Sequence, residues 1–178
     1  MKTEMKAYFD LLINTLKSFN GTYPLIPYDD QVLPKIYVGE MNEEKYISWM
    51  PVEKDEISDF SLMEQEFGIS IHESIKEYFN SYWFADINGY FNSCNIILEP
   101  VLPGQELDNF YAQLCGYHIN HDHKIEYIPI GFDAVTNYLV VVGNTDGVVW
   151  LEDYERQMYY KLSNTLAELI SSLTARNN

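Results

Sequence analysis

The feature that most constrains the fold is a helix-like pattern that runs directly into a strand-like pattern between Glu66 and Phe91. Ser70 and Glu73 have the spacing of a capping box, which predicts that a helix begins near Ile71. Apolar residues then recur every three or four positions: Ile71, Ile75, Tyr78, Phe79 and Tyr82. The intervening positions hold polar side chains: Glu73, Lys76, Glu77 and Asn80. The helix is therefore expected to have one buried side and one exposed side.

The pattern changes to strict alternation from Phe84 onward, which predicts a strand. Gly89 in this strand leaves room for the close approach of another backbone. Asp86 shares one face of the strand with Asn88 and Tyr90, so this face would present an acidic and an aromatic group together.

Further elements are expected on both sides of this unit. Helices are predicted near residues 4–20, 61–67, 107–117 and 153–172, the second with Ser61 and Glu64 as a capping box. Strands are predicted at residues 36–38, 46–50, 94–98, 125–130, 138–142 and 148–151, the last two as a hairpin. This order predicts an α+β fold: a mostly antiparallel twisted sheet covered by helices, with helices at both termini. No repeat or linker divides the chain, so residues 1–178 are expected to form one domain.

Composition narrows the class of protein further. A hydrophobic content of 47% and an aromatic content of 15% exclude a disordered chain. The longest apolar runs are far too short to span a bilayer, and the N-terminus lacks the pattern of a signal peptide. We therefore expect a cytoplasmic protein that does not insert into the membrane.

The charge is strongly negative, with 27 acidic against 11 basic residues and a formal net charge of −16. Nucleic acids and anionic lipids would be repelled, so the expected partner is a basic protein. The charge is also concentrated, because residues 40–66 contain nine acidic side chains against Lys45 and Lys54. The alternative interpretation of this segment is an ordinary solvated face that keeps the protein soluble.

Residues with catalytic or metal-binding potential do not form a persuasive site. The chain has no nucleophile elbow, phosphate-binding loop, dinucleotide-binding fingerprint or zinc-protease motif, so neither an enzyme nor a cofactor is expected. His118, His121 and His123 are spaced closely enough to consider a metal, but they fall where a helix should end, and a solvated helix terminus is favoured. Cys94 and Cys115 are expected to be two buried thiols.

One block of residues resembles the SecY-interacting Syd proteins, which belong to the wider SUKH superfamily. The resembling residues are Trp49-Met50-Pro51, Phe67, Ile69, Ile71, Ile75, Phe79, Trp83, Asp86 and Phe91. A weaker resemblance continues through Phe110, Leu114 and Gly116 and through Leu166-Ala167-Glu168-Leu169. The resemblance therefore covers essentially the full chain.

The resemblance implies an α+β fold without catalytic apparatus and with an acidic concave surface. Through this surface a cytosolic protein docks onto basic cytoplasmic loops of the SecY translocon subunit, and so lies peripherally on the inner membrane. The family is associated with surveillance of aberrant translocon complexes. The residues expected to bind the partner are Glu64 and Asp86 in the resembling block and Glu53, Asp55, Glu56 and Asp59 in the neighbouring loop.

A second interpretation comes from other SUKH relatives. Many of them resemble immunity proteins that bind and neutralise a basic toxin such as a nuclease, and a strongly acidic chain suits that role as well. A toxin gene immediately upstream would favour immunity, whereas recovery of SecY in a pull-down would favour the translocon partner.

Overall fold

The chain has an α+β fold of helices and antiparallel sheets. The computed structural model describes residues 1–175. Within this range the α-helices are α1 (Lys2–Asn20), α2 (Ser61–Phe67), α3 (Glu73–Phe79), α4 (Glu106–Asn120) and α5 (Leu166–Ser172). The predicted α+β class is confirmed, as are the first helix and the long helix after residue 106.

A seven-stranded antiparallel sheet forms the centre, in the order β11-β10-β9-β8-β7-β6-β12. Its strands are β6 (Ile87–Phe91), β7 (Cys94–Leu98), β8 (Tyr127–Asp133), β9 (Leu139–Gly143), β10 (Val149–Asp153), β11 (Met158–Ser163) and β12 (Thr174–Ala175). A three-stranded sheet contains β1 (Leu25–Pro27), β3 (Tyr46–Trp49) and β2 (Tyr37–Val38), the last preceded by the 3₁₀ helix η1 (Pro34–Ile36). A third sheet pairs β4 (Val52–Glu53) with β5 (Tyr82–Trp83). The predicted hairpin between residues 138 and 151 is confirmed as β9 and β10.

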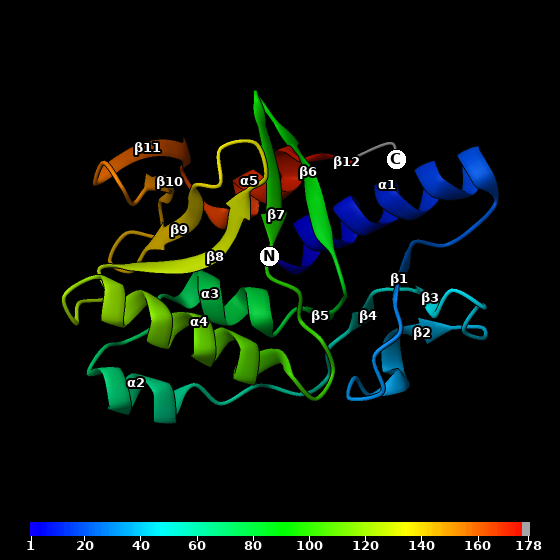
Figure 1. Ribbon diagram of the computed structural model, residues 1–178, viewed down its shortest axis with the longest axis horizontal. Helices are drawn as coiled ribbons and strands as arrows, with labels where there is room; N and C mark the ends of the chain where they lie inside the picture. Colours follow the sequence, from blue (N-terminus) through cyan, green and yellow to red (C-terminus); the bar gives the residue numbers. More distant parts are fainter. Residues whose placement is uncertain (176–178) are drawn as a thin grey trace.

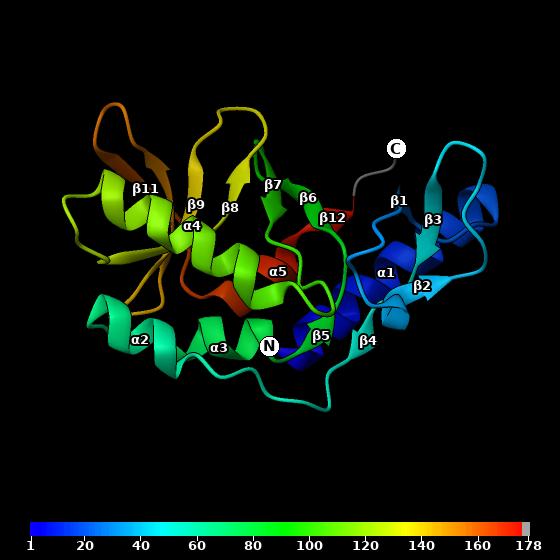
Figure 2. The same ribbon diagram turned by 60° about the horizontal axis from the view of Figure 1, so that its bottom comes forward.

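The helices contact the large sheet in two groups (Figure 1). Helix α4 packs against β8, and α2 and α3 lie beside it on the same side of the molecule (Figures 1 and 2). Helix α5 packs against β11 and α1, and α1 also reaches β12. The three-stranded sheet lies at the opposite end of the molecule from β10 and β11 (Figure 2).

The apolar face predicted for the central helix forms the middle of the core. Ile75, Tyr78 and Phe79 of α3 have no exposed surface. Phe9 of α1 joins this region, with its ring 6.3 Å from that of Trp49 and in contact with those of Tyr82 and Phe84. Full burial of a large apolar side chain contributes about 1.5–3 kcal/mol. The amphipathic helix and the residues that follow it therefore hold the first helix and both small sheets together.

Gly89 provides the close backbone approach that was predicted for it. It lies opposite Ala175 where β6 pairs with β12. A Cβ atom at this position would lie 2.6 Å from the backbone oxygen of Thr174, which a rigid strand cannot avoid. The last strand can therefore join the sheet only because residue 89 has no side chain.

The beginning of α3 differs from the prediction. The helix begins at Glu73, and its N-cap is His72, whose Nδ1 accepts a hydrogen bond from the backbone N–H of Ser74. The expected capping residue, Ser70, lies outside the helix, and its backbone oxygen accepts a hydrogen bond from the side-chain amide of Asn144. The contact between Ser70 and Asn144 of the β9–β10 turn therefore takes the place of the capping box that the sequence predicted.

The predicted final helix over residues 153–172 is wrong in its first half. Met158–Ser163 forms β11, which pairs along β10, and only Leu166–Ser172 is helical. The chain turns back before β11 with Gln157 at φ 53°. Met158 and Leu162 are four positions apart, so they fit a helical stripe, but both also fit one face of a strand. The unpaired backbone of β10 decided between the two, because an edge without a partner leaves its N–H and C=O groups unsatisfied.

Candidate functional site

The acidic loop leaves the small β4–β5 sheet and is held in place by one buried lysine. Val52 lies opposite Trp83, and Glu53 lies opposite Tyr82. The side chain of Lys54 is 4% exposed; its Nζ atom lies 3.7 Å from the centre of the Trp83 ring and 2.9 Å from the hydroxyl of Ser58. Its neighbours Glu53, Asp55 and Glu56 are exposed to solvent.

This loop faces the polar side of α3 across a cleft of about 760 Å³. The loop contributes Glu53, Lys54, Asp55, Glu56 and Ile57, and α3 with the residue after it contributes Glu73, Lys76, Glu77 and Asn80. Met1 and Lys2 complete the lining. We call this feature the loop–α3 cleft.

Two carboxylates of the cleft are already paired with lysines. Glu53 lies 2.9 Å from Nζ of Lys2, and Glu56 lies 2.6 Å from Nζ of Lys35. Asp55, Glu73 and Glu77 are exposed and form no ion pair with the residues that the structure describes. These three carboxylates are therefore the ones whose negative charge remains open to a partner.

One exposed apolar side chain lines the cleft beside these carboxylates. Ile57 is 86% exposed, more than any other large hydrophobic residue in the described part of the chain. Isolated exposed apolar residues are common, but this one lines the same cleft as the unpaired carboxylates. The cleft thus offers both charge and an apolar contact to a partner.

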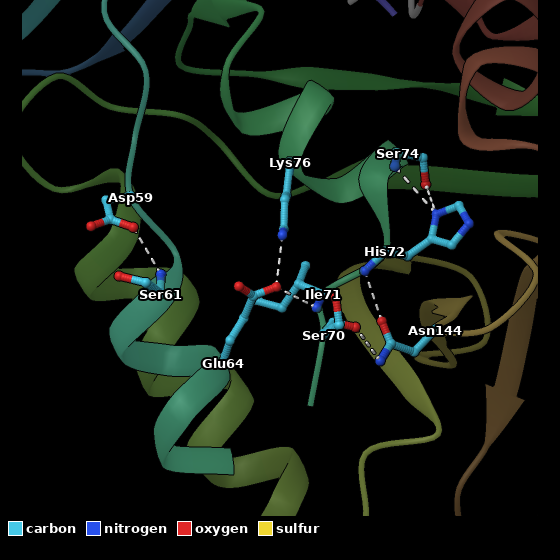
Figure 3. Close-up of polar contacts among 9 residues, drawn as sticks. All are labelled: Asp59, Ser61, Glu64, Ser70, Ile71, His72, Ser74, Lys76 and Asn144. Carbon is cyan, nitrogen blue, oxygen red and sulfur yellow. Dashed lines mark hydrogen bonds and ion pairs between the residues drawn. The ribbon is translucent and has the colours of Figure 1, made fainter. Parts of the chain in front are cut away.

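Asp59 and Glu64, two of the predicted partner-binding residues, do not line the cleft. Asp59 is exposed, and its Oδ1 accepts a hydrogen bond of 2.9 Å from the backbone N–H of Ser61 (Figure 3). That bond lowers the pKa of Asp59. The predicted capping box of Ser61 and Glu64 is absent, because Phe60 is the N-cap of α2 and no side chain caps it.

Glu64 joins α2 to the start of α3. Its Oε1 lies 2.7 Å from Nζ of Lys76 and accepts a hydrogen bond of 2.8 Å from the backbone N–H of Ile71 (Figure 3). The hydrogen bond from Lys76 is the main cause of a lowered pKa of Glu64; burial opposes it, and the hydrogen bond from Ile71 lowers the pKa further. Both donors belong to the fold, so Glu64 serves to hold α2 against the start of α3.

Asp86 lies apart from the loop–α3 cleft and is half-buried. The side-chain amide of Asn88 donates a hydrogen bond to Oδ2 of Asp86. Burial raises the pKa of Asp86 from 3.8 to about 6, and the hydrogen bond from Asn88 opposes this only in part. Of the six residues predicted to bind the partner, the structure brings together Glu53, Asp55 and Glu56 on the cleft wall, and it places Asp59, Glu64 and Asp86 elsewhere.

Glu73, Glu77 and Ile57 were missed as candidate site residues. The amphipathic pattern had placed Glu73 and Glu77 on the exposed side of the central helix, so their exposure was predictable. Sequence spacing carries no information about which loop packs opposite that side. Only the tertiary structure shows that the acidic loop lies opposite the polar side of α3.

The histidine group does not converge on one point. His118 and His123 lie with their Nδ1 atoms 3.5 Å apart, whereas His121 turns away and lies 2.6 Å from Glu152. Within residues 1–175 no group of three or more potential ligand side chains is placed to hold a metal ion. Cys94 and Cys115 are free thiols, as predicted. Both are half-buried, however, whereas the prediction was that they are buried.

No helix among the described residues is long and apolar enough to cross a membrane.

Comparison with known proteins identifies the family. The family described as Syd protein (SUKH-2) matches residues 2–175. Protein Syd of Colwellia psychrerythraea is 26% identical over an alignment that covers 99% of this chain and 97% of the relative. Protein Syd of Shewanella frigidimarina is 25% identical, with 98% and 78% covered, and that of Aliivibrio fischeri is 26% identical, with 71% and 70% covered. With its α+β architecture and its match over nearly the whole described length, the chain belongs to the Syd protein (SUKH-2) family.

Proposed function

We propose that the protein is a non-catalytic binding protein that uses the loop–α3 cleft to dock onto basic cytoplasmic loops of the SecY translocon subunit. The observation that carries this proposal is the placement of Asp55, Glu73 and Glu77, exposed and without ion pairs among the described residues, along one cleft of about 760 Å³. A concave wall with uncompensated charge fits a protruding basic segment.

The three lysines of the cleft do not cancel this charge, because five carboxylates line it. Their contacts are Lys2 with Glu53, Lys54 with the Trp83 ring and Ser58, and Lys76 with Glu64. A basic partner would therefore meet the unpaired carboxylates without displacing an existing pair. Ile57, exposed on the same wall, would add an apolar contact near the centre of the interface.

The net charge of −16 supports the same conclusion at longer range. A strongly negative protein attracts a basic partner before contact and accelerates association, an effect that salt screens. SecY is proposed as the partner because this chain is a Syd protein and resembles the SecY-interacting members of that family. Its place of action would then be the cytoplasmic side of the inner membrane, where it would monitor the integrity of the translocon.

The test is a binding measurement with purified SecY complex in lipid nanodiscs. Three substitutions, Asp55→Asn, Glu73→Gln and Glu77→Gln, remove the unpaired charge of the cleft while preserving side-chain size. We expect the association rate to fall about tenfold and the fall to be largest at low salt. Thermal unfolding should change little, because none of the three forms an ion pair with the described residues.

The matched control is the triple variant Glu40→Gln, Glu43→Gln and Glu44→Gln, which removes the same charge from an exposed turn in the three-stranded sheet. It should bind with a rate close to that of the native protein. Equal losses in both triple variants would show that only total charge matters and would overturn the assignment to the cleft. Absence of binding to SecY by the native protein at low salt would overturn the proposed partner.

A further inference from the structure

Two histidines meet at the end of α4, where the chain leaves this helix for β8 (Figure 2). The helix ends at Asn120, and His121 is its C-cap. The ring centres of His118 and His123 lie 4.8 Å apart, and their Nδ1 atoms lie 3.5 Å apart. Neither residue lines the loop–α3 cleft, so this pair is separate from the proposed docking surface.

The main chain places the two histidines beside each other. Asp122 and His123 have φ angles of 52° and 61°, in the left-handed region that residues other than glycine adopt infrequently. The backbone N–H of His123 donates a hydrogen bond of 2.9 Å to the backbone oxygen of His118. The chain therefore folds back onto the last turn of α4, and the approach of the two rings does not depend on their side chains alone.

Packing holds one of the two rings. His118 is half-buried, and its ring meets that of Phe67 in α2 edge to face, with the ring centres 5.2 Å apart. His123 is exposed. An ion from solvent can thus reach a pair of imidazoles of which one is already oriented.

The separation of the two nitrogens suits a metal ion better than a hydrogen bond. N–H donors usually lie within about 3.2 Å of their acceptor, so a distance of 3.5 Å leaves at most a weak bond between the rings. Zinc binds imidazole nitrogen at about 2.0–2.1 Å, and two such bonds at the tetrahedral angle place the nitrogens about 3.3–3.4 Å apart. The observed distance differs from this value by only about 0.2 Å.

We propose that Nδ1 of His118 and Nδ1 of His123 together bind a divalent transition-metal ion, with zinc as the best match to their spacing. Both rings then carry their proton on Nε2, so that both Nδ1 lone pairs face the ion. No third ligand side chain among residues 1–175 is placed to join them, so water fills the remaining positions. His121 takes no part, because its Nε2 lies 2.6 Å from Glu152. The ion links the last turn of α4 to the chain that leads into β8.

The test is a calorimetric titration of the full chain with Zn²⁺ in the presence of about 5 mM Mg²⁺, which prefers oxygen ligands and occupies the carboxylates of this acidic protein. We expect one saturable site at Zn²⁺ concentrations of about 10–100 µM, because two imidazoles without a third ligand give a modest affinity. The imidazole ¹⁵N signals of His118 and His123 should shift at Nδ1, whereas those of His121 should not. A tenfold excess of Zn²⁺ over the dissociation constant should raise the unfolding midpoint by about 3–5 °C.

Two substitutions remove the proposed ligands one at a time. His123→Asn and His118→Gln should each weaken Zn²⁺ binding at least about tenfold and abolish the rise in the unfolding midpoint. Asparagine tolerates the left-handed backbone at position 123, and His123 is exposed, so this variant decides if His118→Gln does not fold.

The matched controls are His72→Asn and Cys115→Ser. Asparagine can accept the same capping hydrogen bond as His72 at the start of α3, and Cys115 is a free thiol on α4. Both variants should bind Zn²⁺ with the affinity of the native protein. Loss of binding in Cys115→Ser, unchanged binding in His123→Asn, or no saturable Zn²⁺ site in the presence of Mg²⁺ would overturn the proposal.

Discussion

Oε1 of Glu64 lies 2.7 Å from Nζ of Lys76, and this contact connects the middle of α2 to the polar side of α3. The same oxygen accepts the backbone N–H of Ile71, so one carboxylate fixes both the chain between the two helices and the second helix itself. Glu64 thereby holds α3, and with it Glu73 and Glu77, in position opposite the acidic loop.

Glu64→Gln should destabilise the protein by about 1 kcal/mol at neutral pH, because the amide can still accept from Ile71 but loses the charge that attracts Lys76. The pKa of Glu64 is lowered in the folded protein, so its contribution is present above the ordinary value of 4.5 and is lost as the pH falls below it. Urea unfolding should show a larger difference between native and variant at pH 7 than at pH 4. An equal difference at both values would contradict the role of charge.

Asp86 should show the opposite pH dependence. Burial raises its pKa from 3.8 to about 6, so the fold favours the protonated carboxyl, and this contribution is complete below pH 3.8 and is lost as the pH rises through 6. Asp86→Asn should therefore stabilise the protein at pH 7.5, by up to about 3 kcal/mol at roughly 1.4 kcal/mol per pKa unit. The gain should disappear near pH 4. Urea unfolding at the two pH values measures it, and a loss of stability at pH 7.5 would show that the ionised form is the one the fold requires.

Tyr8 ties α1 to the central sheet through a single backbone site. Its hydroxyl donates a hydrogen bond of 2.7 Å to the backbone oxygen of Asn88 and accepts one of 3.0 Å from the backbone N–H of the same residue. Tyr8→Phe leaves both groups unpaired and should cost about 1–3 kcal/mol in the free energy of unfolding. Tyr90→Phe is the control, because Tyr90 is 45% exposed on the same strand. Equal effects of the two substitutions would exclude the backbone contact as the cause.

Gly89→Ala should destabilise the protein by about 1–3 kcal/mol, because the new Cβ would press against the backbone oxygen of Thr174 and push β12 away from β6. The control is Gly116→Ala in α4, where a Cβ would meet nothing within 4 Å. That change should instead stabilise the helix by up to about 1 kcal/mol. Thermal unfolding distinguishes the two signs, and faster hydrogen exchange of β12 amides in Gly89→Ala would locate the damage. A neutral Gly89→Ala would show that β12 contributes little to stability.

Elements that bury a continuous apolar face could be predicted from the sequence. The spacing of Ile75, Tyr78 and Phe79 predicted the buried side of α3, because a helix has only one set of positions that can face a core. Residues 158–163 could not be assigned in the same way, since Met158 and Leu162 fit both a helical stripe and a strand face. The free edge of β10 resolved that ambiguity, and an edge is visible only once the sheet has formed.

The candidate site, too, was predictable from the sequence only in part. The charge of the loop was evident from the sequence, and so was the polar side of the helix. Of the six residues expected to bind the partner, four belong to this loop and two to the resembling block. Glu64 and Asp86 belong to that block and turn out to be engaged within the fold. Asp55, Glu73 and Glu77 come from two separate elements and meet only across the cleft.

The amino-acid order alone determined the α+β class, the amphipathic helix, the glycine that admits the last strand and the concentrated negative charge, because each depends on residues close in the chain or on composition. Only the tertiary structure decided which carboxylates remain unpaired along the loop–α3 cleft. The physical reason is that ion pairing and burial depend on distances between residues far apart in sequence, and local periodicity contains no measure of those distances.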